Sequence, residues 1–242
     1  MEVLLAKQEV TVSALSELLQ VTGKTIREDL AKLEEQGLLH RVHGGAILAQ
    51  ADQLGLLSPK EPYIRYSDEK LEIAEQAVKL IDPGDIIALD VGSTTLEIAK
   101  LLGNHPLTVV TNDVNIISEL ARKDDIRLVV PGGYRVRNML IGSESVDYIR
   151  KLNIQKAFLS ATGVHPEYGF TIYTGDLLEG KRALLETAHT RYCVADHHKF
   201  GQCALRTFAQ LSEVEAIITD SGITSQSIEP FHRAGVKVLI RE

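Results

Sequence analysis

The sequence lacks any apolar stretch long enough to cross a membrane, and its N-terminus carries no export signal. A membrane-spanning helix needs about 20 apolar residues, whereas Met1 is followed by neither a basic segment nor a cleavage site. There are only two cysteines, Cys193 and Cys203, and their spacing is not that of a metal site. We therefore expect a cytoplasmic protein with reduced thiols, no membrane association, no bound metal and no cofactor.

The sequence also lacks the glycine-rich signatures of common nucleotide sites. Neither G-x-x-x-x-G-K-[ST] nor a complete G-x-G-x-x-G occurs, so binding of nucleoside triphosphates or dinucleotides is not expected. The net charge is −7, which argues against coating of nucleic acid by the whole chain. Residues 1–50 hold five Lys/Arg and seven Asp/Glu. Any DNA binding must therefore depend on a few well-placed cations in each subunit, and on an oligomer.

What the sequence does contain, in residues 10–46, is the pattern of two short helices followed by a hairpin. Thr11 is a suitable N-cap for the first helix. The predicted inner face of this helix carries four apolar residues, Ala14, Leu15, Leu18 and Leu19. We place the turn that ends this helix at Gln20-Val21.

The second helix is predicted to begin after Thr22, which can cap it. Apolar residues repeat along its inner face at Ile26, Leu30 and Leu33. The outer face, where a recognition helix meets base edges and phosphates, carries Lys24, Thr25, Arg27 and Glu28. Gly37 should stop the helix, and residues 39–42 with a tip at Gly44-Gly45 predict a two-stranded wing. An ordinary helical hairpin has the same apolar spacing, so the wing is what favours DNA binding.

These segments resemble the N-terminal domain of the DeoR family of bacterial sugar-catabolism repressors. The resemblance rests on T-I-R-x-D-L at residues 25–30 and L-x-R-x-H-G-G-A at residues 39–46. The sequence departs from the family at Glu28, where a second arginine is usual, and at the first helix, which normally starts several residues upstream of Met1. The resemblance implies binding to double-stranded operator DNA through Thr22, Lys24, Thr25, Arg27, Glu28, Lys32, Arg41 and His43.

The periodicity divides the chain into a winged helix-turn-helix domain (residues 1–48), a linker (49–66) and a second domain (67–242). The 242 residues are enough for two modest cores, and the linker has no periodicity and contains Pro59 and Pro62. From Ser67, a predicted helix cap, short apolar strands alternate with helices, which indicates an α/β domain with a mostly parallel sheet. The predicted strands are residues 86–90, 108–111, 127–130, 156–162, 191–196, 215–220 and 237–240.

Four of the predicted strands end in small polar residues or glycines, at residues 90–95, 111–112, 131–133 and 160–163, the last group starting at Ser160. Ligands bind beyond the carboxyl ends of the strands in an open parallel sheet, so these ends should converge on one site. The segment from Gly92 to Thr95 also opens a helix, whose free N–H groups and dipole favour a phosphate. Candidate counter-charges are Lys181, in a helix predicted from Asp176 to His189, and Lys199. We interpret the adjacent His197 and His198 as polar loop residues.

The resemblance to the DeoR family extends over this second domain. The family's sensor domain is similar in fold to ribose-5-phosphate isomerase and CoA transferases, and it implies a site for a phosphorylated sugar that releases the repressor from DNA. Thr162 stands where the family usually has an acidic residue, and His197-His198 where it commonly has a serine pair. The residues implied to bind the effector are Asp90, Gly92, Ser93, Thr94, Thr95, Thr111, Asn112, Gly132, Gly133, Thr162, Lys181, Asp196 and Lys199.

Two functions from different classes are compatible with these patterns, and the first is favoured. It is a ligand-responsive repressor of a carbohydrate-catabolism operon, acting as a homodimer or homotetramer and having no catalytic residues. The alternative is a sugar-phosphate isomerase-like enzyme with an appended helical domain, in which Asp90, Glu179 and Lys181 would form the catalytic set. A binding module without regulatory coupling is the third reading, and its DNA affinity would not respond to ligand.

The exposed face of the predicted recognition helix gives the first testable prediction. Arg27→Ala should lower operator affinity by about 1–3 kcal/mol for each half-site, because a base-contacting arginine is lost. A gel-shift titration at fixed salt, on a duplex that the wild-type chain selects from a random-sequence pool, measures this. Unchanged affinity would remove Arg27 from the DNA contacts.

Overall fold

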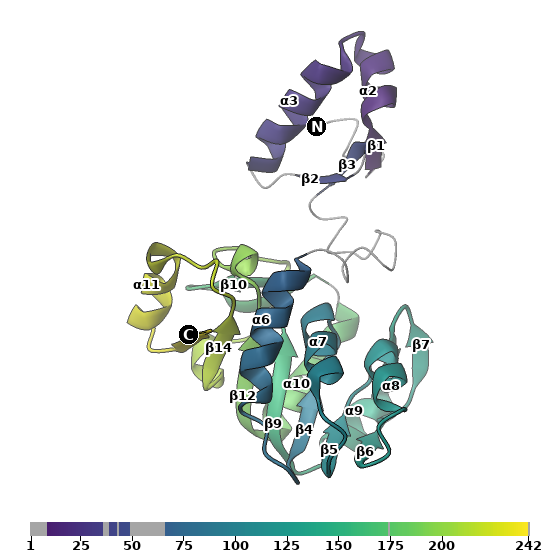
Figure 1. Ribbon diagram of the computed structural model, residues 1–242, viewed down its shortest axis with the longest axis vertical. Helices are drawn as coiled ribbons and strands as arrows, with labels where there is room; N and C mark the ends of the chain where they lie inside the picture. The colour runs from purple at the N-terminus through teal and green to yellow at the C-terminus, as the bar shows by residue number, and fades with distance from the viewer. Residues whose placement is uncertain (1–8, 36–38, 43, 49–65, 174, 242) are drawn as a thin grey trace. The chain divides into compact units, whose positions relative to one another are not determined.

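A computed structural model describes residues 9–35, 39–42, 44–48, 66–173 and 175–241 of the chain. The chain divides into two compact units, Met1–Pro62 and Tyr63–Glu242, and each is described by itself (Figure 1). The predicted linker, residues 49–66, lies outside the described residues except for Tyr66. Within the described segments, no helix has both the length and the apolar character needed to span a bilayer.

The first unit contains the predicted helix pair and wing. Helix α2 (Val12–Leu19) and helix α3 (Gly23–Glu35) are followed by the antiparallel strands β2 (Leu39–Val42) and β3 (Gly45–Leu48). An additional strand that the sequence did not reveal, β1 (Glu9–Thr11), pairs with β3 and completes a sheet of order β1-β3-β2. The observed order of elements therefore confirms a winged helix-turn-helix fold.

Local hydrogen bonds explain where the two helices begin and where the first one ends. The Thr11 hydroxyl accepts from the Ala14 N–H at 3.1 Å, and the Thr22 hydroxyl accepts from the Thr25 N–H at 3.2 Å. Gln20 ends α2 in the left-handed conformation (φ 55°). Both predicted N-caps and the predicted turn are thus confirmed.

The predicted inner face of α2 is wrong in part. Leu15 is buried, but Leu18 and Leu19 are 59% and 54% exposed and Ala14 is also exposed. The helix instead buries Val12 together with Leu15, because β1 leads directly into it and brings Val12 to the core. The small core of this unit consists of Val10, Val12, Leu15, Ile26, Leu30, Leu39 and Ala46, with Leu33 packed against it.

The second unit is built on a seven-stranded parallel sheet of order β15-β14-β12-β9-β4-β5-β6. The predicted parallel sheet is therefore confirmed, with strand ends that differ from the predicted ones by no more than three residues. The strands are β4 (Ile86–Leu89), β5 (Leu107–Val110), β6 (Ile126–Val129), β9 (Ile154–Ser160), β12 (Ala188–Val194), β14 (Ala216–Thr219) and β15 (Lys237–Ile240).

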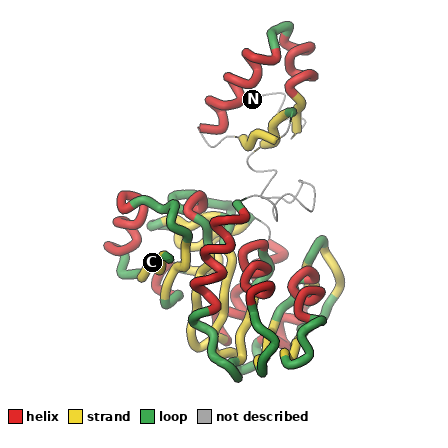
Figure 2. The backbone as a smooth tube through the Cα atoms, viewed as in Figure 1, coloured by secondary structure: helices red, strands yellow, loops and turns green. Residues whose placement is uncertain are grey.

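Helices cover both faces of this sheet, which explains why its strands are almost continuously apolar (Figure 2). One face packs against α6 (Ser67–Val78), α7 (Ser93–Leu101) and α8 (Val114–Leu120). The other packs against α9 (Ser143–Ile149) and α10 (Leu178–Thr187), with α11 (Ser225–Arg233) contributing Phe231. The alternation of strand side chains between two separate cores matches the period of a β-strand.

Several short elements of this unit were not predicted. They are the hairpin β7 (Tyr134–Val136) and β8 (Met139–Ile141), helices α9 and α11, and an antiparallel sheet of β10 (Gly163–His165), β11 (Gly169–Ile172) and β13 (Arg206–Ala209). Two boundaries are corrected as well. Ser67 is the first residue of α6, and the cap is Tyr66 in a left-handed conformation. The helix predicted from Asp176 to His189 begins at Leu178, after the 3-10 turn η1 (Gly175–Leu177), and His189 lies in β12.

The tip of the wing gives a prediction about stability. A Cβ at Gly45 would lie 2.1 Å from the Val10 carbonyl oxygen, whereas one at Gly44, at φ +83°, would meet nothing within 4 Å. Gly45→Ala should therefore destabilise the first unit by about 1–3 kcal/mol, because β1 must move away from β3. Gly44→Asn should cost less than about 1 kcal/mol, because Asn tolerates the left-handed region. Amide hydrogen exchange over residues 9–48 measures both, and equal protection in the two variants would contradict this account.

Candidate functional site

The outer face of α3 is the candidate DNA-reading surface. Lys24, Thr25, Arg27, Glu28 and Lys32 are all exposed on this helix, as the sequence predicted. The Lys24 ammonium lies 3.9 Å from the Glu28 carboxylate, one helical turn away. This distant pair between two exposed side chains is weak, but it offsets part of the positive charge that Lys24 would offer to a phosphate.

The wing adds Arg41 to this surface. Its guanidinium is bonded to Glu34 in the last turn of α3, at 2.7 Å. The other predicted wing residue, His43, lies outside the described residues. The described part of the first unit thus offers Lys24, Arg27, Lys32 and Arg41 as exposed cations.

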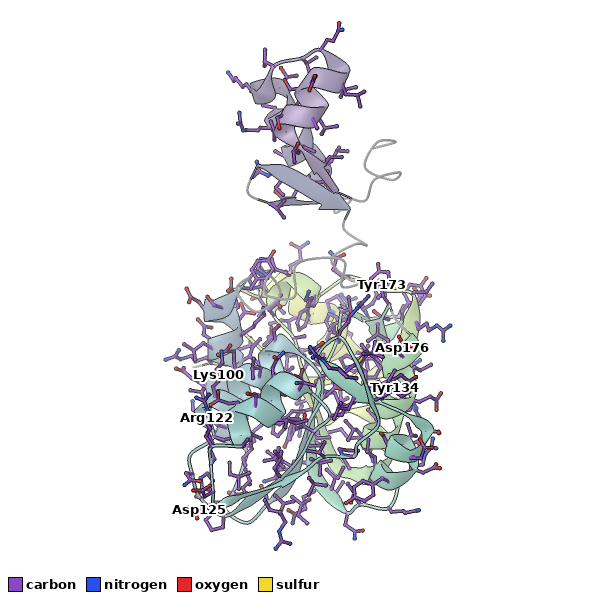
Figure 3. All side chains as sticks on the ribbon, turned by 90° about the vertical axis from the view of Figure 1, so that its right-hand side faces the viewer. Lys100, Arg122, Asp125, Tyr134, Tyr173 and Asp176 are labelled. Atoms are coloured by element: carbon purple, nitrogen blue, oxygen red, sulfur yellow. The ribbon has the colours of Figure 1, made fainter. Side chains whose placement is uncertain are left out.

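The second unit has a cavity of about 320 Å³ beside the carboxyl ends of β4 and β5. It lies between these strand ends and the elements β8, α9, η1 and α10. Its apolar lining is Val91, Leu140, Ile141, Val146, Ile149, Leu177 and Leu184. Its polar lining is Asp90, Asn112, Ser143, Ser145, Asp176, Glu179 and Lys181, with Gly142, Gly175 and Gly180. Figure 3 views the hairpin side of this unit, with Tyr134 of β7 and Asp176 labelled.

Asp90 and Lys181 form a buried ion pair at this cavity. The two residues are 3% and 1% exposed, and the Lys181 ammonium is bonded to Asp90 Oδ2. Ser160, at the end of the neighbouring strand β9, donates its backbone N–H to the same oxygen at 2.9 Å. The Lys181 ammonium also donates to the Ser160 carbonyl oxygen at 2.7 Å. The strand ends at Asp90 and Ser160 therefore meet, as the parallel topology predicted.

This pairing changes the electrostatic interpretation of the cavity. Lys181 was expected to be a counter-charge for a phosphate, but the structure pairs it with the Asp90 carboxylate. The described lining contains three carboxylates, from Asp90, Asp176 and Glu179, and one ammonium, from Lys181. The formal charge of these side chains is −2, so the cavity has no surplus positive charge for an anion.

The segment from Gly92 to Thr95 opens helix α7 as predicted, but it is not part of the described cavity lining. The Thr95 hydroxyl donates to the backbone oxygens of Asp90 and Gly92, at 2.7 and 2.9 Å. A Cβ at Gly92 would lie 2.9 Å from Ser160 Cβ, so glycine permits the close approach of β4 and β9 here. Thr94 is buried, and Ser93 is half-buried at the start of the helix.

The ends of β5 and β6 hold the unpredicted hairpin β7-β8 in place. The Asn112 side chain lines the cavity and donates to the Leu140 carbonyl oxygen at 2.9 Å. The buried Thr111 hydroxyl accepts from the Asp113 N–H. Gly132 accepts from the Ser145 hydroxyl at 2.7 Å, and a Cβ at Gly133 would lie 2.3 Å from the Ile141 carbonyl oxygen. Except for Asn112, these predicted site residues support the cavity and do not line it.

The remaining predicted residues lie farther along the sheet. Thr162 donates its backbone N–H to Thr171, and it is not among the described lining residues. Asp196 begins the 3-10 turn η2 (His197–Lys199) after β12 and accepts from the His198 N–H at 3.2 Å. Burial alone would raise the pKa of Asp196, but the hydrogen bond from His198 and the charge of Lys199 outweigh burial and lower it.

His197 and His198 are more than polar loop residues. His197 Nδ1 lies 2.5 Å from Oδ2 of the buried Asp220, within hydrogen-bonding distance. The His198 ring stacks on the Tyr66 ring, with 3.9 Å between the ring centroids. Each histidine, in the turn that follows β12, therefore has a specific partner from another part of the unit. Among the described residues, no group of three or more His, Cys, Asp or Glu side chains is arranged to hold a metal ion.

Sequence reasoning missed one wall of the cavity and one buried carboxylate. The wall comes from β8 and α9, residues 140–149, where no element had been predicted. The carboxylate is Asp113, which caps α8 through the Asn115 and Ile116 N–H groups. Its other oxygen accepts from the Gly92 N–H at 3.2 Å and from the Asn138 side chain at 2.9 Å. The signal for its capping role was an Asp two residues after a predicted strand and directly before a helix.

Comparison with known proteins gives matches over most of the chain. Residues 1–52 match the DeoR-like helix-turn-helix domain, and residues 65–221 match the DeoR C terminal sensor domain. The HTH-type transcriptional repressor GlcR of Bacillus subtilis is 32% identical over 235 residues, covering 96% of this chain and 90% of that protein. A lactose phosphotransferase system repressor of Staphylococcus epidermidis is 31% identical over 217 residues, with coverage of 88% and 86%. The solved structure of a ribose 5-phosphate isomerase A from Methanocaldococcus jannaschii matches with a TM-score of 0.41 and 20% identity, over 57% of this chain and 55% of that one.

Asp113 gives a prediction about pH. Burial raises the pKa of its carboxyl to about 6, from 3.8 in an exposed group, despite four hydrogen bonds that favour the charged form. The folded protein therefore holds this proton up to a higher pH than the unfolded chain does. The stability from this group is complete below pH 3.8 and is lost as the pH rises through about 6. Between about pH 5 and about pH 7.5, the unfolding free energy should therefore fall by about 1.4 kcal/mol because of this group.

Urea unfolding of the second unit at these two pH values, for the wild-type chain and for Asp113→Asn, measures the effect. The variant does not titrate at this position, so the difference in unfolding free energy between the two proteins should change by that amount. A difference that is independent of pH would show that Asp113 is ionised throughout.

Proposed function

The chain belongs to the DeoR family of transcriptional regulators and carries the DNA-binding and sensor domains of that family, and we propose that it represses a carbohydrate-catabolism operon. It binds operator DNA through α3 and the wing, and an effector in the cavity of the second unit releases it. The observation that supports this most directly is a cavity with hydrogen-bonding groups at the strand ends of a unit joined to a winged helix-turn-helix.

The cavity lining supports a carbohydrate as the effector. Asp90 and Asp176 supply acceptors, Asn112 and the serines supply both donors and acceptors, and leucine and isoleucine side chains supply apolar surface. Such a mixture suits a small polyhydroxylated ligand, whose hydroxyls donate and accept while its C–H faces pack on apolar groups. The named relatives, which include a lactose phosphotransferase system repressor, support the same ligand class.

We propose further that the effector carries a phosphate, which is bound by the first-turn N–H groups of α7. No acidic residue lies in the first turn of this helix. The start of α9 is less suitable, because the Ser143 hydroxyl donates to the Glu144 carboxylate at 3.2 Å. Asp176 and Glu179 would repel a phosphate elsewhere in the lining. The Asp90–Lys181 pair is then left to bind sugar hydroxyls.

The chain acts as a binding protein and not as an isomerase in this proposal. A general base must be free to take a proton, yet Asp90 is held by the Lys181 ammonium and by Ser160. Glu179 is exposed at the surface, 4.0 Å from Arg150. Turnover of pentose or hexose phosphates by the purified protein would contradict the proposal.

We also propose that the chain forms a homodimer or homotetramer, because the first unit of a single chain offers few cations to the phosphate backbone of DNA.

The effector proposal is tested with matched sugars and sugar phosphates. Calorimetry should show binding of the phosphorylated member only, because loss of charge-assisted hydrogen bonds should weaken binding at least about 100-fold. Ser93→Ala should weaken binding of the sugar phosphate by about tenfold, whereas Ser143→Ala should leave it unchanged. Equal affinity for both members of a pair would remove the phosphate from the proposal. The reverse order of the two serine variants would move the phosphate to α9.

A further inference from the structure

The carboxylate of Glu34 holds the wing at two points. Its Oε1 accepts from the Arg41 backbone N–H at 2.8 Å, and its Oε2 accepts from Arg41 Nε at 2.7 Å. Glu34 lies in the last turn of α3, and Arg41 lies in the wing strand β2. One side chain of the recognition helix therefore fixes both the backbone and the side chain of a wing residue.

The position of β2 explains the backbone half of this contact. The sheet order is β1-β3-β2, so in the described part of the unit β2 is an edge strand, with no strand next to its outer N–H groups. The Glu34 carboxylate supplies an acceptor to that edge. A carboxylate at the C-terminal end of a helix is otherwise unfavourable, because the helix dipole is negative there. The Arg41 guanidinium offsets that charge.

This pair is too exposed for its main effect to be on stability. The Glu34 and Arg41 side chains are 32% and 47% exposed, and ion pairs of this kind contribute about 0–1 kcal/mol. The two simultaneous hydrogen bonds instead fix the orientation of the Arg41 guanidinium, because this group is flat and its donors have fixed relative directions. With Nε bound to Glu34, the N–H groups of Nη1 and Nη2 have no partner among the described residues.

We propose that Glu34 is a positioning residue for DNA binding: it fixes the wing against the recognition helix and orients the free edge of the Arg41 guanidinium toward a DNA phosphate. The inference rests on the proposed operator binding, and it assigns a favourable role to a carboxylate on an acidic DNA-binding unit. Removing this negative charge would strengthen attraction to DNA if Glu34 acted only through its charge. The positioning role predicts the opposite result.

The test uses the full chain and a duplex that the wild-type protein selects from a random-sequence pool. Glu34→Gln should weaken binding by about fivefold to tenfold, because the amide nitrogen of Gln cannot accept from Arg41 Nε. The dependence of affinity on salt should not become weaker, because the charge of Arg41 is retained. Arg41→Ala should weaken binding and also lower the salt slope by about 0.9 for each subunit. In the Arg41→Ala background, Glu34→Gln should cause no further loss.

A second carboxylate on the same helix provides the matched control. Glu28→Gln removes one negative charge from α3, as Glu34→Gln does, but leaves the contact between Glu34 and Arg41 intact. We expect Glu28→Gln to tighten DNA binding, whereas Glu34→Gln weakens it. If Glu34→Gln binds as tightly as the wild-type chain or more tightly, or if its loss adds to that of Arg41→Ala, the positioning role is overturned. Circular dichroism melting of each variant separates loss of fold from loss of orientation. Failure of the wild-type chain to select any duplex would refute operator binding itself.

Discussion

The buried ion pair between Asp90 and Lys181 is the interaction on which the second unit most depends. It joins the end of β4 to helix α10, and through Ser160 it also joins the end of β9. Two charges removed from water are stable only while each satisfies the other, and loss of one partner from such a pair typically costs about 3–5 kcal/mol. The pair therefore fixes the distance between the sheet and α10, and with it the width of the cavity that lies between them.

The same pair restricts what the cavity can bind. Because Asp90 neutralises Lys181, the charge that a ligand meets is set by Asp176 and Glu179, both acidic. In the proposed complex a ligand phosphate is bound by N–H and hydroxyl groups, whose hydrogen bonds are directional and short-ranged. Neutral groups of this kind distinguish ligands by shape and hydroxyl position more than by charge. Such a cavity suits discrimination among similar sugars, which is the task of a regulator that responds to one of them.

The sheet was predictable from the sequence and half of the cavity was not, for physical reasons. Strands buried on both faces are short, continuous apolar runs, and their carboxyl ends must lie at one edge, so Asp90, Asn112 and Ser160 could be placed together. Helix α9 has only seven residues, and β7 and β8 have three each, too few to show a period. The partners of Asp113 and Lys181 come from segments distant in sequence, and only the folded chain shows that they meet.

The first unit reaches a defined geometry by a different route from the second. Among the described residues its core consists of seven buried side chains, four of them on the two helices, so apolar packing alone constrains the wing weakly. Hydrogen bonds at the edges supply the rest: those that the Thr11 and Thr22 hydroxyls accept as helix caps, and those that Arg41 donates to Glu34. With few cations available, each must be oriented before DNA arrives, since ordering a long side chain on binding costs about 0.5–1.5 kcal/mol. An acidic residue that preorganises an arginine can therefore favour binding to a polyanion.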